Sequence, residues 1–130
     1  MNKDFILKFF RFGCIGGLTF LFDASCFWLL LKLIALPEAA RAISVILAMT
    51  MSWLLNRTFT FGASGTRPGW LEWLKFLVSQ LPGAGVNALA SLLFLHYVMN
   101  NPWLAVACGS CAGLAVNFFM ASRFVFRKSA

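Results

Sequence analysis

Charged residues are scarce in this chain of 130 residues, where Asp, Glu, Lys and Arg together make up 12% of the sequence. Only four residues are acidic, and histidine and tyrosine occur once each. Soluble domains carry about twice this share of charged residues, and a fold this small buries only part of its apolar surface. The scarcity of charge therefore excludes a soluble enzyme domain and a disordered tail.

Residues that bind metals or form disulfides are also few, which excludes a disulfide-rich secreted module. Cys108 and Cys111 have a C-x-x-C spacing, but they lie in an apolar run without acidic or histidine neighbours, and zinc needs more ligands. His96 stands alone, and no nucleophile, base and orienting group occur together. We therefore expect no enzymatic activity, no metal and no cofactor. We interpret the four cysteines as small packing residues: Cys14, Cys26, Cys108 and Cys111.

Hydrophobic residues are abundant, at 61% of the chain, and they fall into four long runs. A membrane-spanning helix needs about 20 such residues. Very short connections, around Pro37 and at residues 100–102, join the runs into two antiparallel hairpins. We predict an all-α membrane protein whose four transmembrane helices form a single domain over residues 1–130. The predicted spans cover approximately residues 9–36, 39–55, 70–99 and 103–121.

The distribution of cations predicts the orientation. Of the eleven Lys and Arg residues, nine lie in or near the two termini and the central loop at about 57–72, and only Lys32 and Arg41 lie on the opposite side. This asymmetry predicts that both termini and the loop are cytoplasmic, in the inner (plasma) membrane. It also accounts for the net charge of +7 without a nucleic-acid partner. The nine are Lys3, Lys8, Arg11, Arg57, Arg67, Lys75, Arg123, Arg127 and Lys128.

The two hairpins resemble each other in sequence, which indicates an internal duplication. A unit of two spans returns to its starting side, so two copies have the same orientation and form a parallel 2+2 repeat. Repeat one covers about residues 9–61 and repeat two about 73–126. A shift of 64 residues places Arg11 on Lys75, Phe12 on Phe76 and Asp23 on Asn87, and a shift of 65 places Ser52 on Asn117, Phe59 on Phe124 and Phe61 on Phe126.

Small residues recur every four positions along each span, so we expect every helix to carry a tightly packed seam. Such spacing lets helix backbones approach closely in lipid, with occasional polar groups bonding across. We also expect the glycines of the first span, Gly13, Gly16 and Gly17, to serve close helix contact. The clearest rows are Ser44, Ala48, Ser52 and Asn56 in the second span, Ser79, Gly83, Asn87 and Ser91 in the third, and Ala105, Gly109, Gly113 and Asn117 in the fourth.

Two charged residues are harder to explain by packing or orientation. Asp23 lies about halfway along the first span, where an ionised carboxylate costs several kcal/mol unless it is paired, so it is a functional candidate. The alternative is a structural role as a buried partner of Asn87 or Asn117. Arg41 lies near the outer end of the second span, and its alternative is snorkelling to the interface.

Arginines also occur where the second and fourth spans end on the predicted cytoplasmic side. Arg57 follows Asn56, and Arg123 occupies a similar place near the C-terminus. A guanidinium group can hold a phosphate with two parallel hydrogen bonds. The alternative for both residues is plain anchoring by positive charge. The alternating aromatic and polar residues here, at 56–61 and 121–126, are typical of an interfacial segment.

The chain resembles the GtrA-like family of small four-span membrane proteins over nearly its whole length. The resemblance rests on the first-span pattern at residues 9–23, on residues 40–44, on the run NRTFTF at 56–61, and on the corresponding second-half residues up to 126. The exit from the second span at 56–61 is the most specific piece. The family usually repeats Asn-Arg in the fourth span, whereas Ala121, Ser122 and Arg123 stand there in this chain.

The resemblance implies a role in cell-surface polysaccharide synthesis. It implies that the protein flips a polyprenyl-phosphate-linked sugar, such as undecaprenyl-phosphate glucose, from the cytoplasmic to the outer leaflet. Because one bundle of four helices has little interior volume, we also expect a homodimer. In this interpretation Arg57 and Arg123 receive the phosphate and Arg41 draws it outward. The remaining polar candidates, which would contact the sugar or support the arginines, are Asp23, Ser44, Asn56, Asn87 and Asn117.

Two other functions remain open at this point. A small proton-coupled multidrug exporter of similar size would use a membrane-embedded acid, and Asp23 is available for that role. Arg41 and Arg57, however, suit an anion better than an organic cation. The second alternative is a scaffold that moves no lipid and recruits a membrane glycosyltransferase.

Overall fold

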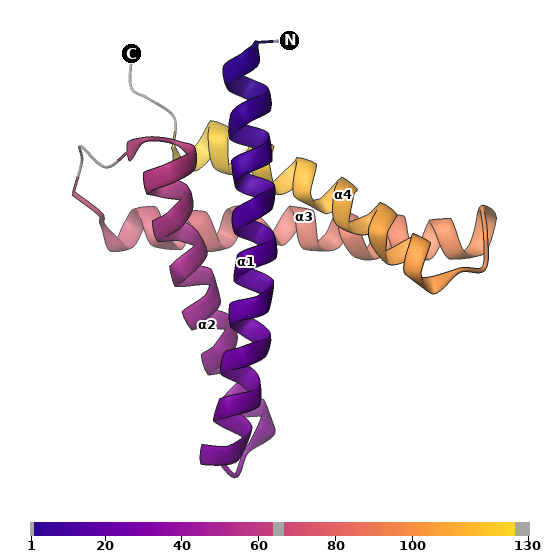
Figure 1. Cartoon of the computed structure of the whole chain (residues 1–130), viewed down its shortest axis with the longest axis horizontal. Coiled ribbons are helices and arrows are strands. Elements are labelled where there is room, and N and C mark those ends of the chain that lie inside the picture. The colour runs from indigo at the N-terminus through magenta and orange to yellow at the C-terminus, as the bar shows by residue number, and fades with distance from the viewer. Residues whose placement is uncertain (1, 64–66, 127–130) are drawn as a thin grey trace. The chain divides into compact units, whose positions relative to one another are not determined.

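The computed structural model of the chain describes residues 2–63 and 67–126. Throughout this part of the chain the regular structure is helical, and it contains no strand. The centre of the loop at 64–66 and the two predicted cytoplasmic cations Arg127 and Lys128 lie outside the described residues. In chain order the elements are α1 (Lys3–Leu33), α2 (Pro37–Leu55), η1 (Asn56–Thr60), α3 (Trp70–Tyr97), α4 (Pro102–Met120) and η3 (Ala121–Val125) (Figure 1).

Within the described part of the chain, four helical segments are long and apolar enough to cross a membrane. The shortest has 23 residues, more than the roughly 20 that a bilayer requires. Large apolar side chains such as Phe20, Leu92 and Trp103 point away from the protein. Such exposure is expected where the surrounding solvent is lipid. The chain is therefore a multi-pass membrane protein with four apolar helices, as predicted.

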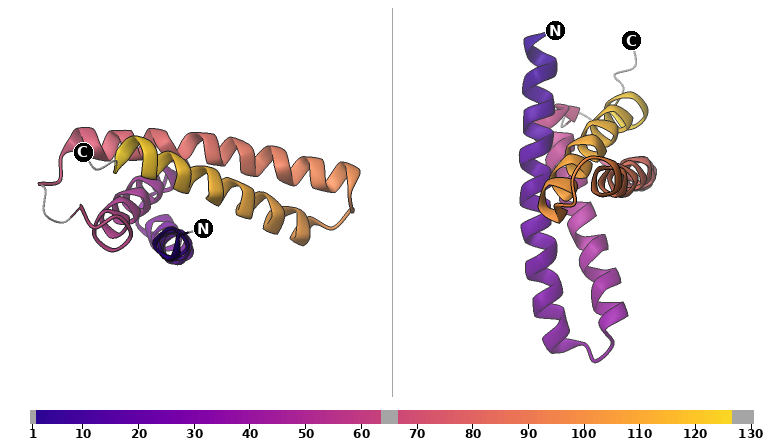
Figure 2. Two further views of the ribbon diagram at one scale, coloured as in Figure 1. Left: turned by 90° about the horizontal axis from the view of Figure 1, so that it is seen from above. Right: turned by 90° about the vertical axis from the view of Figure 1, so that its right-hand side faces the viewer.

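The described residues form two compact units that divide between Arg67 and Pro68. The N-terminal unit contains α1, α2 and η1, and the C-terminal unit contains α3, α4 and η3. In each unit the two long helices run antiparallel as a hairpin (Figure 2). A short π-helical segment follows the second helix of each unit.

Capping residues explain where the helices begin. The Asn2 side chain accepts a hydrogen bond from the Asp4 amide at 3.3 Å, so α1 starts six residues before the apolar run at residue 9. Asn101 accepts from the amides of Trp103 and Leu104 at 3.1 and 3.2 Å, directly before α4. These caps satisfy amide groups that have no partner within the helix.

The first helix ends earlier than predicted, at Leu33 instead of residue 36. Proline disfavours the helical conformation in the residue before it, and Leu36, which precedes Pro37, is extended with φ −104° and ψ 106°. Ile34 is also extended. Pro37 then opens α2, where a missing amide hydrogen does no harm.

Both hairpins end in a single wide turn of π-helix. The amide of Phe61 donates to the carbonyl of Asn56 at 2.9 Å, and that of Phe126 donates to the carbonyl of Ala121 at 3.0 Å. The alternating residues at 56–61 and 121–126 thus stay helical as they leave the spans. Such turns are rare in proteins and occur frequently at functional sites.

The seam predicted from small residues is present in the C-terminal unit. A Cβ atom on Gly113 of α4 would lie 2.6 Å from the carbonyl oxygen of Gly83 and 2.9 Å from Cβ of Asn87. A Cβ atom on Gly109 would collide with the Asn87 carbonyl and the Ser91 hydroxyl. The backbones of α3 and α4 therefore approach so closely that only glycine fits.

The N-terminal unit packs by a different device. On α2 a row of small residues is buried, namely Ala40, Ser44 and Ala48, while α1 buries Phe12 and Ile15. A Cβ atom on Gly17 would meet nothing within 4 Å. The close helix contact predicted for Gly17 is therefore absent from the N-terminal unit as the structure describes it.

Candidate functional site

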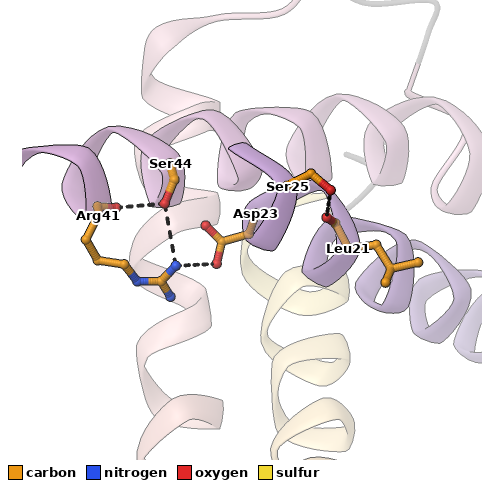
Figure 3. Close-up of polar contacts among 5 residues, drawn as sticks. All are labelled: Leu21, Asp23, Ser25, Arg41 and Ser44. Atoms are coloured by element: carbon orange, nitrogen blue, oxygen red, sulfur yellow. Dashed lines mark hydrogen bonds and ion pairs between the residues drawn. The ribbon is translucent and has the colours of Figure 1, made fainter. Parts of the chain in front are cut away.

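The hairpin of the N-terminal unit brings the two unexplained charges together. Oδ2 of Asp23 lies 2.8 Å from Nη1 of Arg41 (Figure 3). Asp23 lies ten residues before the end of α1, and Arg41 is the fifth residue of α2. Because the connection is short, the two helices run back along each other and these positions face one another. In the sequence-based interpretation Asp23 and Arg41 have different roles, with Asp23 contacting the sugar and Arg41 drawing the phosphate outward, and their contact is not predicted.

Among the residues that the structure describes, only Oδ2 of the Asp23 carboxylate has a hydrogen-bond partner. The side chain is 17% exposed, and its Oδ1 atom is buried without a hydrogen-bond donor among the described residues. Most buried polar atoms in proteins have a partner, and leaving an acceptor unpaired is unfavourable. Oδ1 is therefore an acceptor that the described residues leave unused.

Arg41 is held at one nitrogen only. Its side chain is 50% exposed, and Nη1 contacts both Asp23 and, at the long distance of 3.5 Å, the hydroxyl of Ser44. Within the described chain, Nε and Nη2 make no hydrogen bond, although the guanidinium lies 5.2 Å from the ring of Phe27. Ser44 itself is fully buried and donates to the Arg41 carbonyl at 3.0 Å.

These contacts define a mixed site of donors and an acceptor, which we call the Asp23–Arg41 pair. The guanidinium offers hydrogen-bond donors to an anion, and the carboxylate beside it accepts from a hydroxyl. A ligand that carries a phosphate next to hydroxyl groups matches both halves. A cationic ligand would have to compete with Arg41 for Asp23.

The polar residues around η1 form a second, buried group. Asn56 is 1% exposed, and its Nδ2 donates to the Ser52 carbonyl at 3.0 Å while its Oδ1 accepts from the Thr60 hydroxyl at 2.8 Å. Arg57 is 4% exposed. Asn56 therefore stabilises the end of α2 and its wide turn, and the neighbouring Arg57 is buried.

Sequence reasoning missed Arg11 as a neighbour of this wide turn. Its Nη1 donates to the Phe59 carbonyl at 3.1 Å, and one residue further Phe12 packs against Phe61 with ring centroids 6.3 Å apart. The sequence offers one indication of this contact: a basic and an aromatic residue lie side by side at 11–12, and aromatic residues alternate at 59–61. The sequence indicates Arg11 as a cytoplasmic charge and a repeat position, but not as a contact of the wide turn.

The remaining predicted residues lie in the C-terminal unit. Oδ1 of Asn87 accepts from the Ser91 hydroxyl at 3.3 Å. Oδ1 of Asn117 is buried without a hydrogen-bond donor in the described structure, against Gly83 of the facing helix. Arg123 is exposed, with its guanidinium 5.1 Å from the ring of Phe119.

The structure thus joins Asp23, Arg41 and Ser44, and keeps Asn56 and Arg57 apart from them. From Arg41 to the start of η1 the chain runs 15 residues along α2, roughly 22 Å at 1.5 Å per residue. A single phosphate cannot contact both groups at once. A ligand with one phosphate that contacts both groups in turn would have to move along the hairpin.

Comparisons with known proteins identify the family but no individual relative. A search of the curated proteins finds no match to this chain. The family model described as the GtrA/DPMS transmembrane domain matches residues 11–126, a range that includes the Asp23–Arg41 pair and both wide turns. The chain therefore belongs to the GtrA/DPMS transmembrane-domain family, as its resemblance to GtrA-like proteins indicated.

Proposed function

We propose that this protein moves a polyprenyl-phosphate-linked sugar, such as undecaprenyl-phosphate glucose, from the cytoplasmic to the outer leaflet for cell-surface polysaccharide synthesis. The family supports an involvement with polyprenyl-phosphate sugars. The observation that carries the proposal is the half-satisfied Asp23–Arg41 pair, which lies within apolar helices.

The chemistry of this substrate fits a protein of four helices. The long apolar tail stays in lipid during transfer, and only the phosphate and the sugar need shelter from it. The free donors of Arg41 bind the phosphate, while Oδ1 of Asp23 accepts a hydrogen bond from a sugar hydroxyl. Ionisable groups inside a membrane mark substrate pathways in many transporters, and here both halves of the head group find a partner.

We propose the same orientation for both units, with the N-terminus, C-terminus and central loop in the cytoplasm of a cell whose inner (plasma) membrane holds the protein. The excess of cations on this side supports the orientation. Two similar hairpins, each ending in a wide turn, support a parallel duplication. So do the ring contacts of Phe12 with Phe61 and of Phe76 with Phe126, which correspond under shifts of 64 and 65 residues.

In the completed assembly the two units form a single four-helix domain, and a homodimer would enlarge its interior. Arg57 and Arg123 attract the phosphate to the cytoplasmic side, and Arg41 receives it near the outer side. Asn87 and Asn117 supply further hydrogen bonds to sugar hydroxyls, because the Oδ1 atom of Asn117 still lacks a donor within the described structure.

Leaflet exposure of a labelled polyprenyl-phosphate sugar in proteoliposomes tests the proposal. We expect Asp23→Asn and Arg41→Gln each to lower the initial transfer rate by about tenfold or more, since a hydrogen bond to a charged group contributes about 1.5–3 kcal/mol. Lys32→Gln is the control, because Lys32 lies against the ring of Trp28 and outside the pair. If liposomes with the unaltered protein transfer the lipid no faster than protein-free liposomes, the proposal that the protein is a flippase is refuted.

Two alternatives give different results in related assays. A multidrug exporter would take up organic cations in a proton-dependent way, which the ion pair of Asp23 with Arg41 disfavours because the acid already has a cationic partner. A scaffold would co-purify with a membrane glycosyltransferase and neither bind nor transfer polyprenyl lipid.

A further inference from the structure

Each unit carries an open groove beside its wide turn. The groove of the N-terminal unit measures about 490 Å³ and lies between the first half of α1 and η1. The groove of the C-terminal unit measures about 510 Å³ and lies between the first half of α3 and the end of α4 with η3. We call them the N-groove, lined by Phe10, Arg11, Cys14, Ile15, Thr58 and Phe59, and the C-groove, which includes Leu74, Lys75, Val78, Ser79 and Phe124.

The two grooves are built from corresponding residues. The shift of 64 residues that relates the hairpins matches the four α1 residues that line the N-groove with four α3 residues that line the C-groove. The shift of 65 matches an aromatic lining residue of η1 with one of η3. The correspondences are Phe10 with Leu74, Arg11 with Lys75, Cys14 with Val78, Ile15 with Ser79, and Phe59 with Phe124. Both size and construction therefore recur, although the sequences of the two units have diverged.

One cation without a carboxylate partner stands in each groove. Lys75 makes no hydrogen bond or ion pair with any residue the structure describes. Among these residues Arg11 donates one hydrogen bond, from Nη1 to the Phe59 carbonyl. The neighbouring wall is apolar, formed by Leu74 and Val78 in the C-groove. The only hydroxyl of the α3 wall, that of Ser79, donates to the Phe76 carbonyl at 2.7 Å.

This arrangement fits a phosphate attached directly to a single hydrocarbon chain. In such a lipid the apolar chain begins one bond from the phosphate ester oxygen, just as the apolar wall begins next to the cation. A phospholipid places a polar glycerol diester and two chains at this point.

We propose that each groove binds one polyprenyl phosphate group, with the phosphate on Arg11 or Lys75 and the first isoprenoid units along the apolar wall. One chain thus has two lipid sites at its predicted cytoplasmic end. Arg11 precedes Asp23 by 12 residues of α1, roughly 18 Å, so these sites are separate from the Asp23–Arg41 pair. The choice of polyprenyl phosphate as occupant rests on the proposed function.

Native mass spectrometry of the detergent-purified protein counts and identifies bound lipid. The protein is offered a polyprenyl phosphate, the corresponding polyprenol and phosphatidylglycerol. We expect Arg11→Gln and Lys75→Gln each to remove one bound polyprenyl phosphate per chain, with affinity at that groove about tenfold lower. The double variant loses two. Arg11→Lys restores the lipid, because lysine occupies the corresponding place in the C-groove.

Lys8→Gln is the matched control, since Lys8 is an exposed cation one turn before Arg11 on α1 that does not line the groove. It should keep both lipids, and Arg41→Gln should keep the two groove lipids even though its transfer rate falls about tenfold under the proposed function. Loss of transfer with both lipids retained therefore separates the two proposals. Equal binding of polyprenol or phosphatidylglycerol, or an unchanged count in the double variant, would overturn the groove assignment.

Discussion

At the scale of single residues, partnership decides what each polar group can do. Asp23 and Arg41 were recognisable from the sequence because charges inside apolar runs are rare. Their contact was not, because it joins residues 18 positions apart and depends on the register of two helices. Asn56 shows the converse. It lies beside Arg57 at the end of the second span, yet its side-chain Nδ2 donates to the Ser52 carbonyl and its Oδ1 accepts from the Thr60 hydroxyl.

The fork of Arg41 leads to a first prediction. Arg41→Lys keeps a cation opposite Asp23 but removes the planar group that can hold Asp23 and a phosphate at the same time. We expect the initial transfer rate in proteoliposomes to fall about tenfold, while the amount of folded protein in the membrane stays the same. Lys32→Arg, a similar exchange outside the pair, should leave the rate unchanged. Equal rates for Arg41→Lys and the unaltered protein would contradict a forked contact.

Ser44 allows a second prediction at this scale. Its hydroxyl donates to the carbonyl of Arg41 within the same helix, and its distance to the Arg41 guanidinium is long at 3.5 Å. Ser44→Ala should therefore change the transfer rate by less than about threefold, since the contact with the guanidinium is weak. A loss as large as that of Arg41→Gln would show that the hydroxyl contacts the substrate. The same proteoliposome assay measures both variants.

At the scale of elements, the number and type of the helices followed from apolar runs, and their ends followed from local chemistry. Caps and prolines moved the ends of α1 away from the ends of its apolar run. The wide turns at 56–60 and 121–125 were unpredictable, because the alternating residues there have no helical periodicity. Close packing of the C-terminal hairpin was predictable from its small residues, but within the described N-terminal unit Gly17 meets no close neighbour, since a glycine does not reveal whether a neighbouring backbone lies beside it.

Two glycines of α3 provide a matched test of this packing. A Cβ atom on Gly83 would lie 2.5 Å from the Gly113 carbonyl oxygen and collide with Asn117, whereas one on Gly85 would meet nothing within 4 Å. We expect Gly83→Ala to destabilise the protein by about 1–3 kcal/mol, as overpacking does. Gly85→Ala should leave stability unchanged or raise it by up to about 1 kcal/mol through helix propensity. Unfolding in mixed detergent measures both, and equal stabilities would contradict the close approach.

At the scale of the whole molecule, the distribution of charge makes a prediction about topology. Gly69 precedes α3, and Asn100 lies in the connection between α3 and α4; both are exposed. In a chain whose four native cysteines are replaced by serine, a membrane-impermeant thiol reagent applied to intact cells should label Asn100→Cys and spare Gly69→Cys. The excess of cations on the side of Gly69 is the reason. The reverse pattern of labelling would invert the proposed orientation.

The glycines of the C-terminal hairpin also bear on motion. Where backbones touch, as at Gly83 and Gly113, neither helix can slide or rotate without a collision, whereas an interface of side chains such as Phe12 and Ile15 can adjust through rotamer changes. A transfer cycle would then use α3 and α4 as a fixed block and change the register of α1 against α2. Spin labels across α1 and α2 should give a broader distance distribution than labels across α3 and α4. A register change of this kind would also break and remake the contact of Asp23 with Arg41, so that release of the cargo and movement of the hairpin become one event.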